Sequence, residues 1–422
     1  MSDSAPQPIP GAQEHIAAAH RLAARVDDIP ADTALLPIER VGVVGAGTMG
    51  GGIAMNFLSA GIPVTIVEMA QEALDRGLAT IRRNYEASVK RGKMDAATAE
   101  AAMARLVPTL DFAALADADL VIEAVYEDMA VKKDVFARLD KVAKPDAILA
   151  SNTSFLDINE IATATGRPEA VLGMHFFSPA NVMKLLEVVR ARATGARQLA
   201  TAMALAVKIG KVPVVSGVCF GFIGNRMLAQ RQAQALDLIM EGANYWEVDE
   251  ALLEFGFPMG PWQMADLAGV DLGWHRDPTR IDTLYEALCA VGRWGQKTKK
   301  GFYDYDEARN RTVSDEVKAL IAQFAAKSGK PQRTIGKDEI RERLLYPMIS
   351  EAAKILEEGI AQRASDIDTV WINGYGWPVW SGGPMFWADH IGLGTVVAGL
   401  EKHGLPVAPL LARLAAEGKT FT

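Results

Sequence analysis

The sequence predicts an α/β fold class, a doubly wound, mostly parallel sheet followed by a duplicated, all-helical C-terminal region. From Val41 to about Ser216, apolar runs of strand length alternate with helical stretches, which is the pattern of a parallel sheet. After Gly217 the strand signals fade and helical periodicity dominates. We therefore expect four parts: an N-terminal arm or linker remnant (1–36), a sheet domain (37–216), and two helical domains (217–326 and 334–422).

Seven strands are expected in the sheet domain, at 40–45, 63–68, 119–125, 147–151, 171–177, 185–190 and 212–216. The first strand runs into the pattern Gly-x-Gly-x-x-Gly, and a helix follows it. Gly45 allows a tight turn, Gly47 lets a ligand approach the backbone, and Gly50 lets the helix pack close to the strand. A strand, three glycines and a helix N-terminus together indicate a Rossmann unit that binds a dinucleotide pyrophosphate. The expected contacts are Gly45, Ala46, Gly47, Thr48, Met49 and Gly50.

The second expected strand ends in a carboxylate, Glu68. A carboxylate at this place accepts hydrogen bonds from the ribose hydroxyls and repels a 2′-phosphate, so it favours NAD over NADP. The alternative is a glycine-rich turn in an ordinary α/β domain. The strand, the helix and Glu68 occurring together make NAD the expected cofactor.

Composition excludes several classes of function. The net charge of −8 argues against nucleic acid as a partner. Two cysteines, Cys219 and Cys289, provide neither a disulfide framework nor a metal-binding spacing, which suits a reducing cytoplasm. Because of this cysteine spacing we expect no metal. No apolar run is long enough for a membrane span, so we expect no membrane partner.

The helical region contains an internal repeat. Glu241-Gly242, Gly256-Phe257-Pro258 and Gly260-Pro261 recur in order as Glu358-Gly359, Gly376-Trp377-Pro378 and Gly383-Pro384. The segment 327–333 is the expected linker between the copies. A tandem pair can make within one chain the contact that two subunits would make in a dimer. Both a monomer with an internal pseudo-dimer and a homodimer are compatible with this pattern.

A histidine and a glutamate are expected to pair across a turn. His175 ends one strand, and Glu187 lies within the apolar strand that returns after Ser178-Pro179. A buried carboxylate needs a partner, and a histidine held by a carboxylate is a general base with a fixed tautomer. A purely structural ion pair is the alternative, since structural pairs occur in the same surroundings.

Two further polar side chains lie in apolar surroundings. Ser154 follows a strand at the sheet edge where a nicotinamide is expected, and Asn225 opens the helical region. Either residue can instead be an ordinary helix cap, and this alternative is stronger for Asn225.

Taken together, the motifs resemble L-3-hydroxyacyl-CoA dehydrogenases of fatty-acid β-oxidation. From about Val41 to the C-terminus the chain is most similar to the dehydrogenase half of the bacterial multifunctional β-oxidation protein. The motifs that carry the resemblance are Gly-Ala-Gly-Thr-Met-Gly-Gly-Gly, Ile-Glu-Ala-Val-Tyr-Glu, Ala-Ser-Asn-Thr-Ser, His-Phe-Phe-Ser-Pro, Gly-Phe-Ile-Gly-Asn-Arg, Gly-Phe-Pro-Met-Gly-Pro and Gly-Phe-Tyr. The resemblance implies oxidation of an (S)-3-hydroxyacyl-CoA by NAD, with an acyl-CoA thioester as substrate.

The resemblance also implies a role for each matching residue. His175 corresponds to the catalytic base and Glu187 to its partner, while Ser154 and Asn225 correspond to residues near the reacting groups. The expected cofactor contacts beyond the glycine loop are Glu68, Glu127, Lys132, Ser154, Ser178 and Lys297. The expected substrate contacts are Asn84, Arg91, Ser154 and Asn225. Ser178 departs from the family, which usually has asparagine there, and a serine has a shorter reach.

Two other functions stay open at this point. One is an NAD-dependent dehydrogenase of a small hydroxy acid, and the other is a non-catalytic NAD-binding protein. Turnover of a CoA thioester separates the first alternative from the expected function, and the four polar side chains expected at the site argue against the second.

Overall fold

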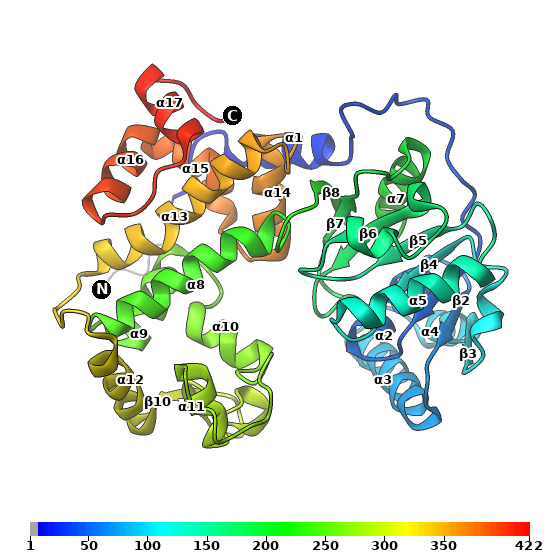
Figure 1. Cartoon of the computed structure of the whole chain (residues 1–422), viewed down its shortest axis with the longest axis horizontal. Coiled ribbons are helices and arrows are strands. Elements are labelled where there is room, and N and C mark those ends of the chain that lie inside the picture. Colours follow the sequence, from blue (N-terminus) through cyan, green and yellow to red (C-terminus); the bar gives the residue numbers. More distant parts are fainter. Residues whose placement is uncertain (1–6) are drawn as a thin grey trace.

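The computed structural model describes residues 7–422, so the first six residues of the predicted arm lie outside the described part. The chain forms two lobes that lie side by side, a sheet lobe and a helical lobe (Figure 1). No helix within 7–422 has the length and apolar character that a membrane crossing requires.

One eight-stranded sheet forms the centre of the sheet lobe, in the order β3-β2-β1-β4-β5-β6-β7-β8. Neighbouring strands are parallel except β6 and β7, which are antiparallel. The strands are β1 (Val41–Val44), β2 (Val64–Val67), β3 (Leu106–Thr109), β4 (Leu120–Glu123), β5 (Ile148–Ser151), β6 (Val171–Phe176), β7 (Leu185–Arg190) and β8 (Val212–Gly217).

Helices cover both faces of this sheet, as expected for a doubly wound fold. One face packs against α2 (Thr48–Ser59), α3 (Gln71–Lys90), α4 (Ala96–Met103) and α7 (Ala196–Lys208). The other packs against η1 (Phe112–Leu115), α5 (Met129–Val142) and α6 (Ile158–Ala162). Because parallel strands covered on both faces are buried throughout, they appear in the sequence as continuous apolar runs.

All seven expected strands are present, and an eighth was missed. β3 lies at the sheet edge and contains Pro108, which cannot donate a backbone hydrogen bond. Its Val107 side chain is exposed, so the strand lacks the apolar run that identifies its neighbours. The short hairpin of β9 (Tyr303–Tyr305) and β10 (Arg311–Val313) was also missed.

The helical lobe is built from two similar units. The long helices α8 and α13 pack against each other at its centre, and shorter helices follow each of them (Figure 1). The first unit contains α8 (Gly224–Met240), α9 (Tyr245–Phe255), α10 (Pro261–Ala268), α11 (Leu284–Ala290), η3 (Gln296–Thr298) and α12 (Asp315–Ser328). The second contains α13 (Lys337–Glu357), α14 (Ala364–Gly374), η4 (Val379–Ser381), α15 (Pro384–Ile391), α16 (Leu393–Lys402) and α17 (Pro409–Glu417).

Aspartates have equivalent roles in the two units. Asp249 accepts hydrogen bonds from the first amides of α10, and Asp368 does the same for α15. Asp266 accepts from the amides of Phe302 and Tyr303, and Asp389 accepts from two amides near the C-terminus of the chain. Carboxylates therefore satisfy the free amides of matching segments in both copies.

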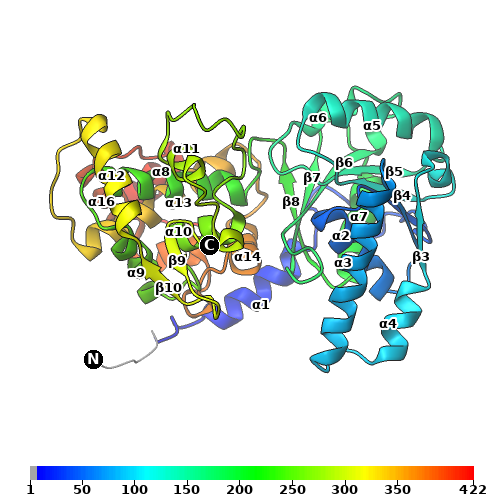
Figure 2. The same cartoon turned by 90° about the horizontal axis from the view of Figure 1, so that it is seen from below.

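The N-terminal arm connects the two lobes. Its helix, α1 (Ala12–Ala23), packs beside α14 beneath the helical lobe (Figure 2). His15 Nε2 lies 2.8 Å from Asp368 Oδ2, and further along the arm Asp28 pairs with Arg190 of β7 at 2.7 Å. The described part of the arm is therefore held in place by contacts with both lobes. One further short helix, η2 (Pro168–Ala170), precedes β6.

Candidate active site

The glycine loop lies between β1 and α2, and its glycines meet specific steric demands. Gly45 has φ of +101°, which a residue with a Cβ adopts only under strain. A Cβ at Gly50 would stand 1.9 Å from the Gly45 carbonyl oxygen, so no larger residue fits the start of the helix. A Cβ at Gly47 would meet no atom within 4 Å, which leaves open space beside the backbone.

That space belongs to a cavity of about 220 Å³. Its lining includes Ala46, Gly47, Thr48, Glu68, Arg76 and Gly77. No side chain caps α2 at Gly47, so the first amides of this helix are free to meet an anion. Glu68 Oε2 accepts a 2.9 Å hydrogen bond from the Ala46 N–H, which fixes the carboxylate at the end of β2. An uncapped helix beside a carboxylate fits the pyrophosphate and ribose of NAD.

A buried ion pair supports the next loop. Glu123, at the end of β4, accepts 2.7 Å hydrogen bonds from Lys132 Nζ and from the Ser151 hydroxyl. Lys132 was expected to contact the cofactor, but its side chain is only 1 % exposed and its second partner, at 3.3 Å, is Glu127. Lys132 therefore holds two carboxylates in place. Glu123 was not singled out in the sequence, although a lone acid ending a buried strand is a usable signal.

Glu127 organises the loop that contains Ser154. Its Oε1 accepts hydrogen bonds from the Thr153 hydroxyl at 2.5 Å and from the Ser154 N–H at 2.8 Å. On the same loop, Asn152 Oδ1 accepts a 2.8 Å hydrogen bond from the Phe176 N–H at the end of β6. These contacts join the ends of β4, β5 and β6 at one edge of the sheet, and the half-buried Ser154 lies there.

His175 and Glu187 face each other across the antiparallel pair β6 and β7. His175 Nδ1 lies 2.8 Å from Glu187 Oε2, and both side chains are almost completely buried. The rings of Phe177 and Phe222 flank the imidazole, at centroid distances of 4.4 and 5.6 Å. The pairing expected from the sequence is present, and the hydrogen bond at Nδ1 leaves Nε2 as the ring nitrogen available to another group.

Glu187 also contacts the helical lobe. Its Oε1 accepts hydrogen bonds from the Ile223 and Gly224 N–H groups, at 3.2 and 3.1 Å. These amides begin α8, and Asn225 is the next residue along the helix. One carboxylate thus brings Asn225 to the same end of the sheet as His175.

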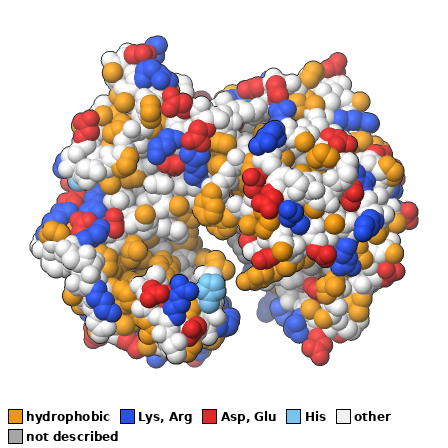
Figure 3. Space-filling model, viewed as in Figure 1, with side chains coloured by type: hydrophobic (Ala, Val, Ile, Leu, Met, Phe, Trp, Pro, Cys, Tyr) orange, Lys and Arg blue, Asp and Glu red, His pale blue; other side chains and the backbone are white. Residues whose placement is uncertain are grey.

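The other expected contacts lie further out. Ser178 is exposed in the loop after β6. Lys297 pairs with Asp271 within the first helical unit, and it is not brought to the dyad. Asn84 and Arg91 belong to the end of α3, where Asn84 contacts the Met55 sulfur at 3.8 Å and Arg91 is exposed. A hollow between the two lobes separates the first helical unit from the sheet lobe (Figure 3).

Comparison with known proteins identifies the family. The model of the 3-hydroxyacyl-CoA dehydrogenase NAD-binding domain matches residues 40–219. The model of the 3-hydroxyacyl-CoA dehydrogenase C-terminal domain matches residues 221–305 and 340–419, a segment in each helical unit. The chain belongs to the 3-hydroxyacyl-CoA dehydrogenase family. NAD is therefore the cofactor of its first domain.

Members of this family resemble the chain over most of its length. A peroxisomal bifunctional enzyme from Cavia porcellus is 43 % identical over 393 residues, which are 87 % of this chain and 53 % of the relative. The chain thus spans about half the length of the curated relatives it matches.

Two solved structures also match nearly all of this chain. The 3-hydroxybutyryl-CoA dehydrogenase from Escherichia coli has a TM-score of 0.77 at 29 % identity, covering 90 % of this chain and 99 % of that one. The dehydrogenase part of multifunctional enzyme 1 from C. elegans has a TM-score of 0.66 at 30 % identity, covering 96 % and 97 %.

Proposed function

We propose that this chain oxidises (S)-3-hydroxyacyl-CoA thioesters to 3-oxoacyl-CoA with NAD, and catalyses the reverse reaction. The observation that carries the proposal is the His175–Glu187 pair at the sheet edge where the glycine loop emerges. In open α/β sheets, ligands bind at the carboxyl ends of the strands. β1, β5 and β6 are parallel, so the glycine loop, Ser154 and His175 share that edge.

The dyad has the arrangement of a general base. In the oxidation, Nε2 of His175 takes the proton of the 3-hydroxyl group while the hydride leaves C3, and NAD supplies the hydride acceptor. Glu187 holds the imidazole through Nδ1 and stabilises its positive charge when Nε2 is protonated. In the reverse direction the protonated His175 returns its proton to the 3-oxo oxygen. Ser154 and Asn225 orient the oxygens of the substrate.

Asn84 and Arg91 are proposed contacts for coenzyme A. They lie about two turns apart at the C-terminal end of α3, in a sequence rich in basic residues. An exposed guanidinium is suited to a phosphate because it donates two parallel hydrogen bonds. Arg91→Glu should raise the KM for a CoA thioester more than the KM for the matching pantetheine thioester. Equal KM changes for both substrates would remove Arg91 from the proposed site.

The function is tested with acetoacetyl-CoA and NADH, by following the loss of absorbance at about 340 nm. General-base catalysis contributes about 10²–10⁴-fold, so His175→Ala should lose at least this much in kcat while NADH still binds. Lack of turnover with 3-oxoacyl-CoA substrates of every chain length, despite NADH binding, would contradict the proposal. Faster turnover of a small hydroxy acid than of any CoA thioester would favour the alternative dehydrogenase.

We further propose that one chain forms a complete helical unit without a partner subunit. The central helices α8 and α13 come from the two repeats and pack against each other, which is the contact expected of a pseudo-dimer. The mass in solution, measured by light scattering over a range of concentrations, distinguishes a monomer from a homodimer that forms through another surface.

A further inference from the structure

The second helical repeat contributes a tyrosine hydroxyl to the surroundings of the dyad. Tyr375 follows the last residue of α14, and its hydroxyl donates a 2.8 Å hydrogen bond to Asn225 Oδ1. Its ring also contacts the ring of Phe177, two residues after His175 in the chain, with the ring centroids 5.4 Å apart. A residue far from Asn225 in the sequence is thus hydrogen-bonded to the Asn225 side chain, which is proposed to contact the substrate.

The position of this tyrosine is fixed by close packing. Its ring stacks on Trp371 at 4.6 Å, and a Cβ at Gly224 would come within 2.2 Å of it. At the end of α14, a Cβ at Gly374 would stand 2.4 Å from the Leu185 side chain of β7. Glycines at 224 and 374 therefore let the end of α14 fit between the start of α8 and the strand that contains Glu187.

The hydroxyl acts as a donor. Burial and the neighbouring Glu187 carboxylate raise the pKa of Tyr375 well above its usual value, so the hydroxyl keeps its proton. Among residues 7–422, Asn225 Oδ1 is the acceptor that the structure provides for this proton. Because the amide oxygen is engaged, the NH₂ group of Asn225 is left to donate to another oxygen.

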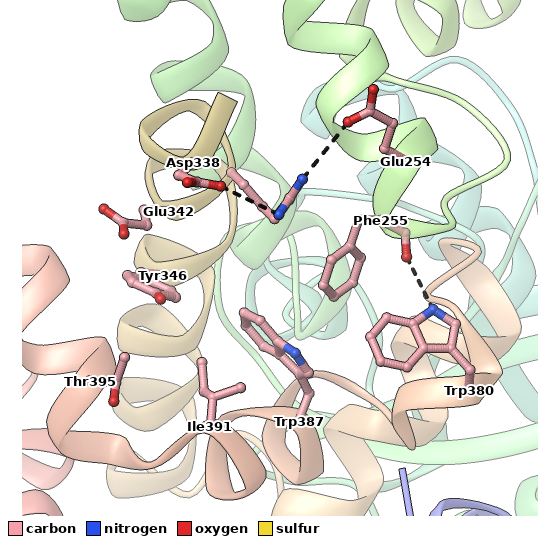
Figure 4. Close-up of a pocket in the computed structure, with 10 residues that line it drawn as sticks. Glu254, Phe255, Asp338, Glu342, Tyr346, Trp380, Trp387, Ile391 and Thr395 are labelled. Carbon is pink, nitrogen blue, oxygen red and sulfur yellow. Dashed lines mark hydrogen bonds and ion pairs between the residues drawn. The ribbon is translucent and has the colours of Figure 1, made fainter. Parts of the chain in front are cut away.

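The internal repeat offers a natural comparison. Aligning Gly256-Phe257 with Gly376-Trp377 places Phe255 at the position of Tyr375, and aligning Glu241-Gly242 with Glu358-Gly359 places Glu342 opposite Asn225. Phe255 and Glu342 both line a cavity of about 540 Å³ (Figure 4). The aromatic ring is thus kept at both equivalent positions, but only Tyr375 of the second repeat has a hydroxyl. Likewise, of the two positions that face these rings, only Asn225 of the first repeat has an amide for the hydroxyl to hold.

We propose that Tyr375 is a positioning residue that orients Asn225, so that the Asn225 NH₂ group donates a hydrogen bond to a substrate oxygen. The inference rests on the proposed function and extends it, because it makes the second repeat a part of the active site. A donor aimed at an oxygen that gains negative charge in the transition state lowers the barrier more than it strengthens binding.

Tyr375→Phe removes only the hydroxyl and keeps the ring against Trp371, Phe177 and Gly224. A neutral hydrogen bond contributes about 0.5–1.5 kcal/mol, so kcat should fall roughly 2- to 12-fold with little change in KM or in melting temperature. Tyr346→Phe is the matched control, because Tyr346 lines the cavity that contains Phe255 and Glu342, the equivalents of Tyr375 and Asn225, and the change should leave kcat unaltered.

A double-mutant cycle with Asn225→Ala separates positioning from simple packing. If Tyr375 acts through Asn225, Tyr375→Phe should have no further effect on kcat in the Asn225→Ala background. An undiminished effect in that background, or a fall in melting temperature that accounts for the lost activity, would overturn the proposal. Failure of the proposed function looks different, since the unmodified chain would then show no 3-oxoacyl-CoA turnover at all.

Discussion

Glu187 Oε1 lies 3.1 Å from the Gly224 N–H, so the carboxylate that holds His175 also accepts from the first turn of α8. The sheet lobe and the helical lobe are therefore joined at the dyad itself. This carboxylate has acceptor oxygens only, and both are used: Oε2 faces the imidazole and Oε1 faces two amides. Any change that alters the donor and acceptor pattern of residue 187 acts on both contacts at once.

Glu187→Gln should lower turnover while preserving shape. The amide oxygen can still accept from the Gly224 N–H, and the NH₂ group must then donate to His175 Nδ1. A histidine that accepts at Nδ1 has its proton on Nε2, where it cannot take the substrate proton. We expect kcat to fall about 10²-fold or more. The measurement is the initial rate with (S)-3-hydroxybutyryl-CoA and NAD, the direction in which His175 must take a proton.

NADH affinity and melting temperature serve as controls for Glu187→Gln, because the glycine loop does not contact residue 187. If the variant kept the unmodified rate and pH profile, the pair would be structural only, which is the alternative that the sequence left open.

Glu68→Ala should weaken the preference for NAD over NADP. The Glu68 carboxylate is fixed by the Ala46 N–H at the edge of the glycine-loop cavity, where a 2′-phosphate would meet its negative charge. We expect the ratio of kcat/KM for NAD to that for NADP to fall by about tenfold or more, since the repulsion of two nearby charges exceeds about 1.4 kcal/mol.

Glu72→Ala is the matched control for Glu68→Ala, because Glu72 is an exposed acid in the first turn of α3 outside that cavity lining. The same ratio in both variants would mean that Glu68 does not face the ribose.

The dyad could be predicted because its geometry is local. His175 and Glu187 belong to consecutive strands joined by a short turn, and opposite residues in an antiparallel pair have neighbouring side chains. The contact of Tyr375 with Asn225 had no such signal, because it depends on how α14 packs against two distant elements. Only the internal repeat gave a hint, by showing a hydroxyl in one copy and none in the other.

The same contrast holds for the fold. The buried strands were predictable because apolar runs bounded by turns identify them, whereas β3 has an exposed valine and a proline at a sheet edge. Likewise, the pairing of His15 with Asp368 joins the N-terminal arm to the second helical unit. The sequence of α1 alone gives no signal of such a distant partner.

Lys211→Met should change how stability depends on pH. Lys211 Nζ donates to the carbonyls of Ala180 and Met183, which belong to the loop after β6, and burial lowers the pKa of Lys211 to about 8. The unfolded chain therefore binds more protons than the folded chain from about pH 8 up to the ordinary lysine pKa near 10.4, and stability rises with pH in that window. The free energy of unfolding of the unmodified chain, measured relative to that of Lys211→Met, should therefore increase by roughly 2 kcal/mol between pH 7 and pH 9.5.

Denaturant unfolding of both proteins at the two pH values provides the measurement for Lys211→Met. Methionine keeps most of the apolar stem without the charge, so the comparison isolates the ammonium group. A difference in stability that stays constant with pH would show that Lys211 keeps its ordinary pKa in the folded chain.

His15→Ala should loosen the N-terminal arm and destabilise the second helical unit. The imidazole pairs with the buried Asp368 at 2.8 Å and stacks on Phe386 with the ring centroids 4.5 Å apart. Removing it leaves a buried carboxylate with fewer partners, and losing one partner of a buried group costs about 1–3 kcal/mol. Burial raises the pKa of Asp368 to about 6 even beside His15, so the carboxylate depends strongly on its remaining donors, the Met385 and Phe386 amides.

His390→Ala is the control for His15→Ala, because His390 is exposed on α15 of the same unit. We expect the His15 variant alone to lose melting temperature and to be cleaved faster by protease within residues 7–36. Equal stability of the two variants would mean that the arm is held by its other contacts, Asp28 with Arg190 among them.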